Sequence, residues 1–449
     1  MVGAIAGPGS PSVPWTASPI DTSVPEFRKE GLGYCYEPRG SGIRLRVDYL
    51  RERSDEFTGE ITVESTLPGV PTHLHQARVN LSSTTARDRL AKHLGTLTPK
   101  EKLQWGRLVE QLCVAVLRRE RQGEPLQRVG RLIGTLRTAD RIERLLPHGK
   151  PTLWYGPAGA GKGWMATFAA VCVQTGTPLA ALRVRQGNVL YLDWEDSAET
   201  LNERVQVVTA GLDLDAAPEI AYRKCRRTLH RDLHAIMRDV ADVAADLVII
   251  DSVGLAAGAA GDRGYEDVAL TLFDCVRYLE PATVLLIDHV TGEASRENKV
   301  IGKAFGSYYK MAEARCAWEV RAEREEGADT SSVGFYHTKF NHSMRYPAMG
   351  FRLEFGPSDP GDPPLYVRLR REDLRETAEL SKNLPLAGRI AGIVRRAPAY
   401  TKDIAELLDE GEPSIRTVLN RYVGRRFIKL QDGRWAPLDT AHDPDGGGA

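Results

Sequence analysis

The stretch Leu153-Trp-Tyr-Gly156-Pro-Ala-Gly-Ala-Gly161-Lys162 decides the fold of this chain. Three apolar residues typical of a buried strand lead into a G-x-x-x-x-G-K loop, and an apolar helical pattern over 164–173 follows. Glycines let backbone N–H groups close around phosphate oxygens, the helix N-terminus adds partial positive charge, and Lys162 reaches the β and γ phosphates. A Gly-rich turn alone would need neither the Lys nor this context. The expected phosphate-binding residues are Gly156, Pro157, Ala158, Gly159, Ala160, Gly161, Lys162 and Gly163.

Gly163 departs from the usual form of this loop. Ser or Thr normally follows the Lys and gives its hydroxyl to Mg²⁺. Gly also lowers helix stability by about 1 kcal/mol. Coordination of Mg²⁺ is therefore expected to depend more heavily on other oxygens.

Acids follow two further apolar runs. Asp251 comes directly after 247–250, which is the Walker-B arrangement, and we expect it to face the phosphate loop and hold Mg²⁺ through water. Asp251 could instead only end its strand or cap the next turn. Glu195 follows the run 189–192, and it is the candidate general base that polarises the attacking water. The alternative gives residues 195–197 the task of starting the next helix, which we assign to Asp196.

A fourth apolar run, 284–287, ends in Asp288-His289. A polar side chain at this strand end can sense the γ-phosphate and relay its loss to a neighbouring loop. A purely structural role for His289 is equally open.

Between about 140 and 370, short apolar runs alternate with helical stretches. The runs are 153–155, 189–192, 247–250, 284–287, 316–320 and 333–337. This alternation predicts an α/β fold with a buried, largely parallel sheet and crossover helices.

The order of these motifs resembles the RecA-like P-loop ATPases (AAA_25-like) of the RepA-type hexameric replicative helicases, over roughly 138–370. The resemblance rests on the loop, on 191–196 with Glu195, on 247–252 with Asp251, and on 287–289 with His289. It implies a RecA-like core in which Glu195 is the catalytic base and His289 couples hydrolysis to DNA. It also implies a basic residue that completes the site of the adjacent subunit.

That trans-acting residue has several candidates. Lys303, Lys310, Arg315 and Lys339 all follow the fourth run, and the Lys-x-Asn piece that begins at Lys339 resembles the family best. A solvated surface position is the ordinary fate of such side chains. We expect Lys339 or Arg315 to act as the finger.

The segment 381–438 carries 11 Lys and Arg against 6 Asp and Glu, a local excess of 11 − 6 = +5, although the whole chain has 60 of each. Helical patterns over 386–396, 403–408 and 414–423 and an Asp-Gly hairpin signal over 427–435 predict a winged helix. Duplex DNA binding is the expected role, and protein docking is the alternative. The candidate DNA contacts are Arg416, Asn420, Arg421, Arg425, Arg426, Lys429 and Arg434.

The remaining sequence predicts the outer parts of the chain. Residues 1–25 are expected to form a disordered arm, 26–125 an α+β domain of unknown role, 126–370 a linker and the ATPase core, and 439–449 a disordered tail. The alternation from Ile43 predicts a strand, and the capping box that begins at Thr98 predicts the start of a long helix. Six scattered cysteines and no signal peptide indicate a cytoplasmic protein.

Together these features predict an ATP-dependent helicase or translocase that uses ATP and Mg²⁺ in the replication of phage, plasmid or mobile-element DNA. The expected partners are single-stranded DNA at the core, duplex DNA at the C-terminal domain and further copies in a homo-hexamer, with no membrane. Two alternatives stay open: an ATP-binding DNA-docking or assembly protein in which nucleotide is a structural switch, and a RecA-like recombinase that forms filaments.

Overall fold

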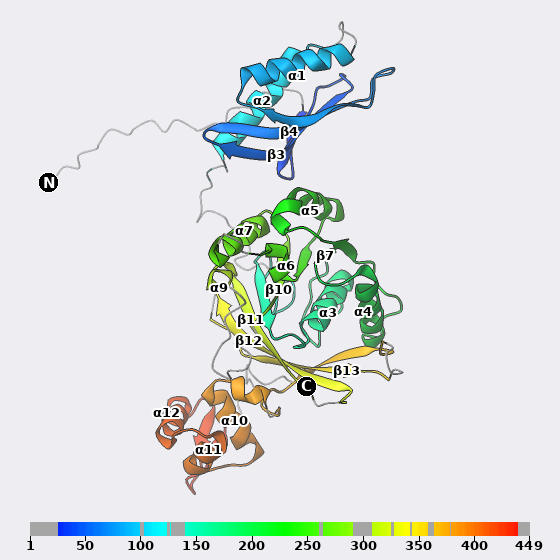
Figure 1. The fold of residues 1–449 in the computed structure, drawn as a ribbon. Coiled ribbons are helices and arrows are strands. Elements are labelled where there is room, and N and C mark those ends of the chain that lie inside the picture. Colours follow the sequence, from blue (N-terminus) through cyan, green and yellow to red (C-terminus); the bar gives the residue numbers. More distant parts are fainter. Residues whose placement is uncertain are drawn as a thin grey trace, which may run out of the picture. The chain divides into compact units, whose positions relative to one another are not determined.

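The computed structural model describes residues 26–98, 103–123, 126, 140–259, 264–290, 308–324, 327–341, 344–357, 363–377 and 379–438 (Figure 1). The chain divides into two compact units, Met1–Leu132 and Ile133–Ala449. The expected arm and tail, most of the expected linker, and Lys303 lie outside the described residues.

Unit 1 is an antiparallel sheet with two helices. Its strands pair in chain order, and the alternation that begins at Ile43 forms β3, in which Ile43, Leu45 and Val47 are buried and Tyr49 is exposed. The core joins Leu45 and Ile61 of the sheet to Leu94 and Val109 of the helices. The elements are β1 Glu26–Glu30, β2 Gly33–Glu37, β3 Ile43–Arg53, β4 Glu56–Ser65, β5 His73–Asn80, α1 Thr84–Leu97 and α2 Trp105–Gln122.

The helix expected from Thr98 begins later, so that prediction is wrong. Thr98 is the C-cap that follows α1, and α2 begins at Trp105. The Thr98 hydroxyl donates to the Leu94 carbonyl at 3.1 Å and accepts from the Trp105 indole N–H at 2.6 Å. The Thr98 side chain therefore binds the last turn of α1 and the first residue of α2, and it does not cap the N-terminus of α2.

Unit 2 is built on a nine-stranded sheet in the order β14-β13-β12-β11-β6-β10-β9-β7-β8. Pairing is parallel from β11 to β8 and antiparallel from β11 to β14, so the largely parallel sheet that the sequence predicted is confirmed. The bounds are β6 Thr152–Gly156, β7 Val189–Asp193, β8 Ala221–Lys224, β9 Leu247–Asp251, β10 Thr283–His289, β11 Cys316–Glu323, β12 Thr330–Phe340, β13 Met349–Phe355 and β14 Val367–Glu372.

Helices cover both faces of this sheet (Figure 1). The helices α3 and α4 pack on one face against alternate strand residues such as Tyr191, Ile249 and Leu285. The intervening residues, among them Leu192 and Ile250, are also buried and face α5 and α6. The bounds are α3 Lys162–Thr175, α4 Ala198–Gly211, α5 Leu229–Val243, α6 Val253–Ala257, α7 Tyr265–Arg277 and α9 Tyr308–Glu313.

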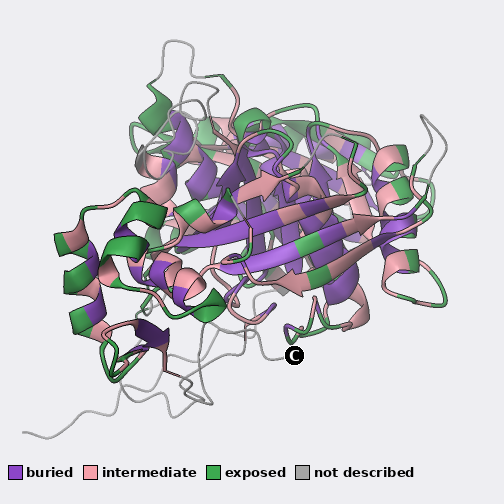
Figure 2. Ribbon diagram, turned by 90° about the horizontal axis from the view of Figure 1, so that it is seen from below, coloured by how far each residue is buried: buried purple, intermediate pink, exposed green. Residues whose placement is uncertain are grey.

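Burial follows this layering. Figure 2 shows buried strands crossing the middle of unit 2, while the exposed residues gather on the outer sides of the helices. All six cysteines of the chain are buried free thiols. No helix among the described residues combines the length and apolarity needed to span a bilayer.

The last part of unit 2 is a small bundle with a hairpin. Its core contains Ile390, Ile404, Leu419, Phe427 and Trp435. Strands β15 and β16 pair antiparallel, and Gly433 in the turn between them has φ 89°. All three helices lie within two residues of the spans that the sequence predicted. The bounds are η1 Leu380–Asn383, α10 Leu386–Arg396, α11 Thr401–Leu408, α12 Glu412–Tyr422, β15 Phe427–Lys429 and β16 Trp435–Pro437.

Candidate nucleotide site

The phosphate loop joins β6 to α3. Gly161 is the N-cap of α3 with φ 79°, a left-handed conformation that favours glycine. A Cβ on Gly156 would lie 2.0 Å from the Val320 carbonyl oxygen, so the approach of β11 also requires glycine there. The first turn of α3 carries no acid and no side-chain cap, which leaves its N–H groups available to an anion.

Lys162 lies inside this loop and is 4% exposed. Its Nζ donates to the carbonyl oxygens of Gly156 at 2.8 Å and Pro157 at 2.7 Å. Burial lowers the pKa of Lys162 to about 8, although nearby carboxylates oppose this shift. A phosphate that displaced the carbonyls would give this ammonium a charged partner.

The parallel register gathers the predicted strand-end residues beside the loop. His289 of β10 lies opposite Gly156, and Asp251 of β9 lies opposite Asp193 of β7. Because the carboxyl ends of parallel strands meet at one edge, residues from three crossover units converge there. The Asp193 carboxylate accepts hydrogen bonds from the backbone N–H groups of Glu195 and Asp196, both at 2.8 Å, and so fixes the turn that carries Glu195.

A chain of polar contacts links the loop to Glu195. Lys162 Nζ lies 3.4 Å from His289 Nδ1, and His289 Nε2 lies 3.3 Å from Glu195 Oε1. The same oxygen accepts the Ser252 hydroxyl at 2.5 Å. Lys162 can only donate, so a neutral His289 protonated at Nε2 satisfies every contact of the chain. The structure thus brings together Lys162, His289 and Glu195 as the sequence suggested, and it adds Ser252.

Glu195 is held ionised by this environment. Its hydrogen bond with His289, assisted by that from Ser252, lowers the pKa of Glu195 to about 2 against the opposing effect of burial. The side chain is 41% exposed, so water can reach the carboxylate. Such a group orients and polarises a water molecule more readily than it retains that water's proton.

Asp251 occupies the buried end of β9. Its Oδ2 accepts the Tyr191 hydroxyl at 2.7 Å, and burial raises the pKa of Asp251. Asp288 is fully committed elsewhere, since its Oδ2 pairs with Lys310 Nζ at 3.0 Å and both side chains are buried. Without Lys310 the buried Asp288 carboxylate would lose the cation that neutralises it. Lys310 is therefore held inside its own chain, and the interpretation of it as a possible finger is wrong.

The helix start that we assigned to Asp196 belongs to Ser197. The Ser197 hydroxyl accepts from the Thr200 N–H at 3.3 Å and caps α4. Asp196 instead pairs with Arg204 Nη2 at 3.1 Å, eight residues further along the chain. Its carboxylate is therefore used to hold a cation at the edge of the site.

Arg204 is a site residue that sequence reasoning missed. Its Nη1 lies 3.5 Å from the position that a Cβ on Gly163 would occupy. The ring of Trp164 lies 5.8 Å from the guanidinium carbon. The sequence showed at Gly163 that a hydroxyl ligand is missing. No local pattern indicated that Arg204, 41 positions further along the chain, lies beside that place.

The donor set fits nucleotide phosphates better than it fits Mg²⁺. Of the two usual protein ligands, the Asp251 carboxylate is present and the hydroxyl after Lys162 is not. A guanidinium lies beside the place of that missing hydroxyl. Across the described ranges, no cluster of three His, Cys, Asp or Glu side chains could hold a metal ion.

The phosphate loop follows the carboxyl end of β6. Both finger candidates lie instead near the level at which β6 begins. Arg315 precedes β11, whose first residue pairs with Thr152 at the start of β6, and Lys339 pairs with Ala317. Measured along the strands, Arg315 lies about five residue steps, or roughly 17 Å, from the level of Gly156, and Lys339 about three steps, or roughly 10 Å. Lys339 Nζ donates to the carbonyls of Met311 and Ala312 at the end of α9, whereas the Arg315 side chain is exposed.

Of the seven candidate DNA contacts in the C-terminal bundle, all but Arg426 and Arg434 are exposed. On α12, Arg416, Asn420 and Arg421 are exposed while Ile415 and Leu419 face the core. Some of the candidates have partners within the chain. Arg416 pairs with Glu412 at 2.7 Å and Arg434 with Asp432, Arg426 lies over the Tyr422 ring and Lys429 over that of Trp435, and Arg425 is exposed.

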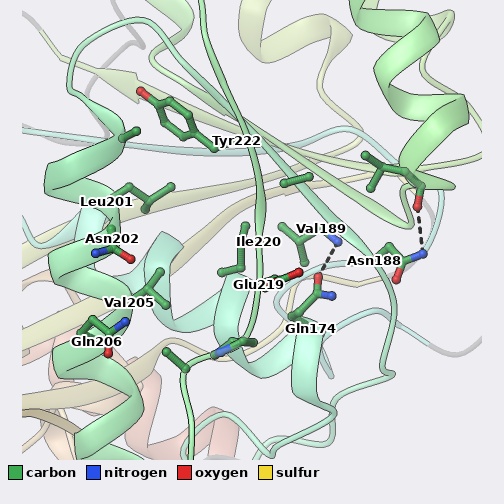
Figure 3. A pocket seen from close by; sticks show the side chains of 15 residues that line it. Gln174, Asn188, Val189, Leu201, Asn202, Val205, Gln206, Glu219, Ile220 and Tyr222 are labelled. Carbon is green, nitrogen blue, oxygen red and sulfur yellow. Dashed lines mark hydrogen bonds between the residues drawn. The ribbon is translucent and has the colours of Figure 1, made fainter.

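A cavity of about 650 Å³ lies away from this site. It is bounded by α4 and by the amino ends of β7 and β8 (Figure 3). Glu195 lies elsewhere, because it follows the carboxyl end of β7. Two of its amides are already used, because Gln174 accepts from the Val189 N–H and Asn188 donates to the Val243 carbonyl. None of the candidate site residues lines it.

Comparison with known proteins gives a family match over part of this core. The family described as an AAA domain matches residues 118–295. Curated proteins gave no match. A solved structure, the KaiC-like protein PH0186 from the hyperthermophilic archaeon Pyrococcus horikoshii OT3, is similar with a TM-score of 0.35 and 16% identity over 55% of this chain and 99% of that chain. The AAA match and the loop geometry support a RecA-like P-loop ATPase core in unit 2.

Proposed function

We propose that this protein hydrolyses ATP at the loop 156–163 and couples hydrolysis to movement along DNA, as a helicase or translocase of the RepA-like hexameric type. The ATPase part rests on one observation, the contact chain from Lys162 through His289 to Glu195. This chain of contacts links Lys162, which would bind the phosphates, to Glu195, which would polarise the attacking water.

The proposed mechanism starts from the contacts of Lys162. An incoming γ-phosphate draws its ammonium away from the Gly156 and Pro157 carbonyls, and the first-turn N–H groups of α3 bind further phosphate oxygens. His289 then loses its donor at Nδ1 while it still contacts Glu195. The ionised Glu195 orients a water molecule in line with the phosphorus. His289 is thus placed to report whether the γ-phosphate is present.

Completion of the site would come from another copy of the chain. Arg315 is exposed and lies just before β11, at the amino ends of the parallel strands. From there it cannot reach the loop of its own chain, which follows the carboxyl end of β6. Charge that develops on the transferred phosphoryl group favours a guanidinium supplied by a neighbour. Of the two candidates, Arg315 fits this role better than Lys339, whose ammonium is already bound by two carbonyls.

The DNA part of the proposal is supported by the basic C-terminal bundle and by the motif order of the core. Exposed Arg416, Asn420 and Arg421 on one side of α12 would meet duplex DNA in the manner of a winged helix. Single-stranded DNA at the core, a hexameric ring and a role in phage, plasmid or mobile-element replication follow from the resemblance to RepA-type helicases.

A second candidate function has one observation in its favour. Gly163 removes a metal ligand, and Arg204 lies beside its place. A site of this kind can bind ATP firmly and turn it over slowly, so that nucleotide acts as a structural switch in a DNA-docking or assembly protein. Steady-state turnover separates the two functions.

The decisive measurement is ATP hydrolysis with and without single-stranded DNA, for the natural chain and for Glu195→Gln. We expect the natural chain to be stimulated by DNA, and the variant to bind ATP equally well but hydrolyse it about 100-fold more slowly or worse, because an amide cannot polarise water as a carboxylate does.

Glu203→Gln is the matched control, since Glu203 is exposed on α4. It should hydrolyse ATP at the natural rate. Unchanged turnover in Glu195→Gln would refute the assignment of the base. Firm ATP binding without turnover in the natural chain would favour the switch.

A further inference from the structure

Arg204 lies beside Gly163, the position at which this phosphate loop lacks the usual Ser or Thr side chain. Its Nη1 is 3.5 Å from the Cβ position of Gly163, the residue that follows Lys162. A Ser or Thr there would direct its hydroxyl to the metal that bridges the β and γ phosphates. The guanidinium therefore lies beside the place of the missing hydroxyl.

Two contacts hold Arg204 in place. Its Nη2 donates to Asp196 Oδ2 at 3.1 Å, and its guanidinium carbon lies 5.8 Å from the centre of the Trp164 ring. Both partners belong to the site itself, because Trp164 is in the first turn of α3 and Asp196 follows Glu195. A guanidinium has five N–H donors in a planar fork, so a single carboxylate leaves donors for a phosphate.

We propose that Arg204 binds the β and γ phosphates of the nucleotide within its own chain and supplies there the positive charge that Mg²⁺ supplies in loops with the hydroxyl. ATP binding therefore persists without Mg²⁺. This inference rests on the proposed binding of ATP at the loop 156–163, and it adds a phosphate ligand that the loop motif does not contain.

The competing explanation is structural: the Arg204–Asp196 pair could serve only to fix the turn that carries Glu195. That role would be lost equally with or without metal. A direct phosphate contact predicts instead that the loss of Arg204 matters most when Mg²⁺ is absent. The two explanations therefore differ in the ratio of affinities in Mg²⁺ and in EDTA.

The test measures the affinity of a non-hydrolysable ATP analogue by calorimetry, in Mg²⁺ and in EDTA. The natural chain should lose less than about threefold in affinity when Mg²⁺ is removed. Arg204→Ala should lose about tenfold or more on the same change, the worth of one charge-assisted hydrogen bond. Arg204→Lys, which keeps the charge, should fall between them.

Three further variants make the result specific. Arg238→Ala, at an exposed position of α5, removes a charge away from the site and should behave as the natural chain does. Asp196→Asn frees Arg204 and should keep metal-independent binding. Arg204→Ala combined with Gly163→Ser restores the hydroxyl and should recover affinity only in Mg²⁺.

A natural chain that loses tenfold or more in EDTA would overturn the inference, and so would equal ratios in the natural chain and Arg204→Ala. Failure of the proposed function gives a different result, because the natural chain would then bind no analogue in either buffer. Lys162→Ala marks that outcome, since it removes the cation that the loop itself provides.

Discussion

His337 is a base enclosed by aromatic rings in unit 2. It is 7% exposed and stacks on Trp318 at 4.1 Å and on Tyr346 at 5.3 Å between ring centres. Its Nδ1 accepts the Tyr346 N–H at 2.7 Å, which requires that nitrogen to be unprotonated. Burial lowers the pKa of His337 to about 4 from 6.5, so the folded protein keeps this ring neutral.

This depressed pKa predicts an acid-sensitive fold. Between pH 6.5 and about 4 the unfolded chain binds a proton at His337 that the folded chain does not, so the free energy of unfolding falls as the pH falls through this window and is fully retained above it. Thermal unfolding of His337→Asn should show a shallower decline over this range, because asparagine keeps an acceptor for the Tyr346 N–H and does not titrate.

His230→Asn serves as the comparison, because His230 is exposed on α5. Its decline with pH should parallel that of the natural chain. If His337→Asn also follows the natural chain, the acid sensitivity arises elsewhere.

Some residues of the candidate site could be predicted from the sequence and others could not. Lys162, Glu195, Asp251 and His289 were found because each stands at the end of an apolar run, and parallel strands bring such ends together. Arg204 was missed because its place beside Gly163 depends on how α4 packs on α3, which no local pattern encodes.

At the level of elements, the sequence predicted strands whose apolar runs are buried on both faces. The strands β6, β7, β9 and β10 all have this form. The edge strands β8 and β14 were missed because they are short and mostly half-buried, and the sequence Ala-Tyr-Arg-Lys of β8 carries no period. The helix α1 was missed because only Leu90 and Leu94 of its 14 residues are buried.

The helix α12 is the element that gives the DNA proposal its sharpest test. Arg421 and Arg425 are exposed, while Arg416 is paired with Glu412. If the first two neutralise phosphates, Arg421→Ala with Arg425→Ala should weaken binding of the whole chain to all duplex sequences alike. The slope of log affinity against log salt should fall by about 0.9 for each phosphate that the variant no longer neutralises. Fluorescence anisotropy over a salt series measures it.

Lys382→Ala is the control for this experiment, since Lys382 is exposed on η1 and pairs with Glu379 at 2.6 Å. Its slope should equal that of the natural chain. Arg416→Ala should instead relax any sequence preference, as expected of a base contact. No duplex binding at low salt, together with capture of a protein partner, would make the bundle a docking module.

At the scale of the whole molecule, the two units have separate cores. The core of unit 1 joins β2–β5 to α1 and α2, and every residue proposed to contact nucleotide belongs to unit 2. The fragment 133–449 should therefore hydrolyse ATP within about twofold of the natural rate, which a coupled-enzyme assay measures. A folded fragment, verified by circular dichroism, that lacks turnover would show that unit 1 takes part in the ATPase cycle.

The burial of all six cysteines makes the protein convenient for chemical labelling. Each thiol is at most 2% exposed, and burial raises the pKa values of the thiols, so maleimides find no reactive sulfur on the folded surface. A single cysteine introduced in place of Arg315 would then be the one position that takes a dye. Copies labelled separately and mixed would report, through energy transfer, whether two copies associate near this position, without any change to the natural cysteines.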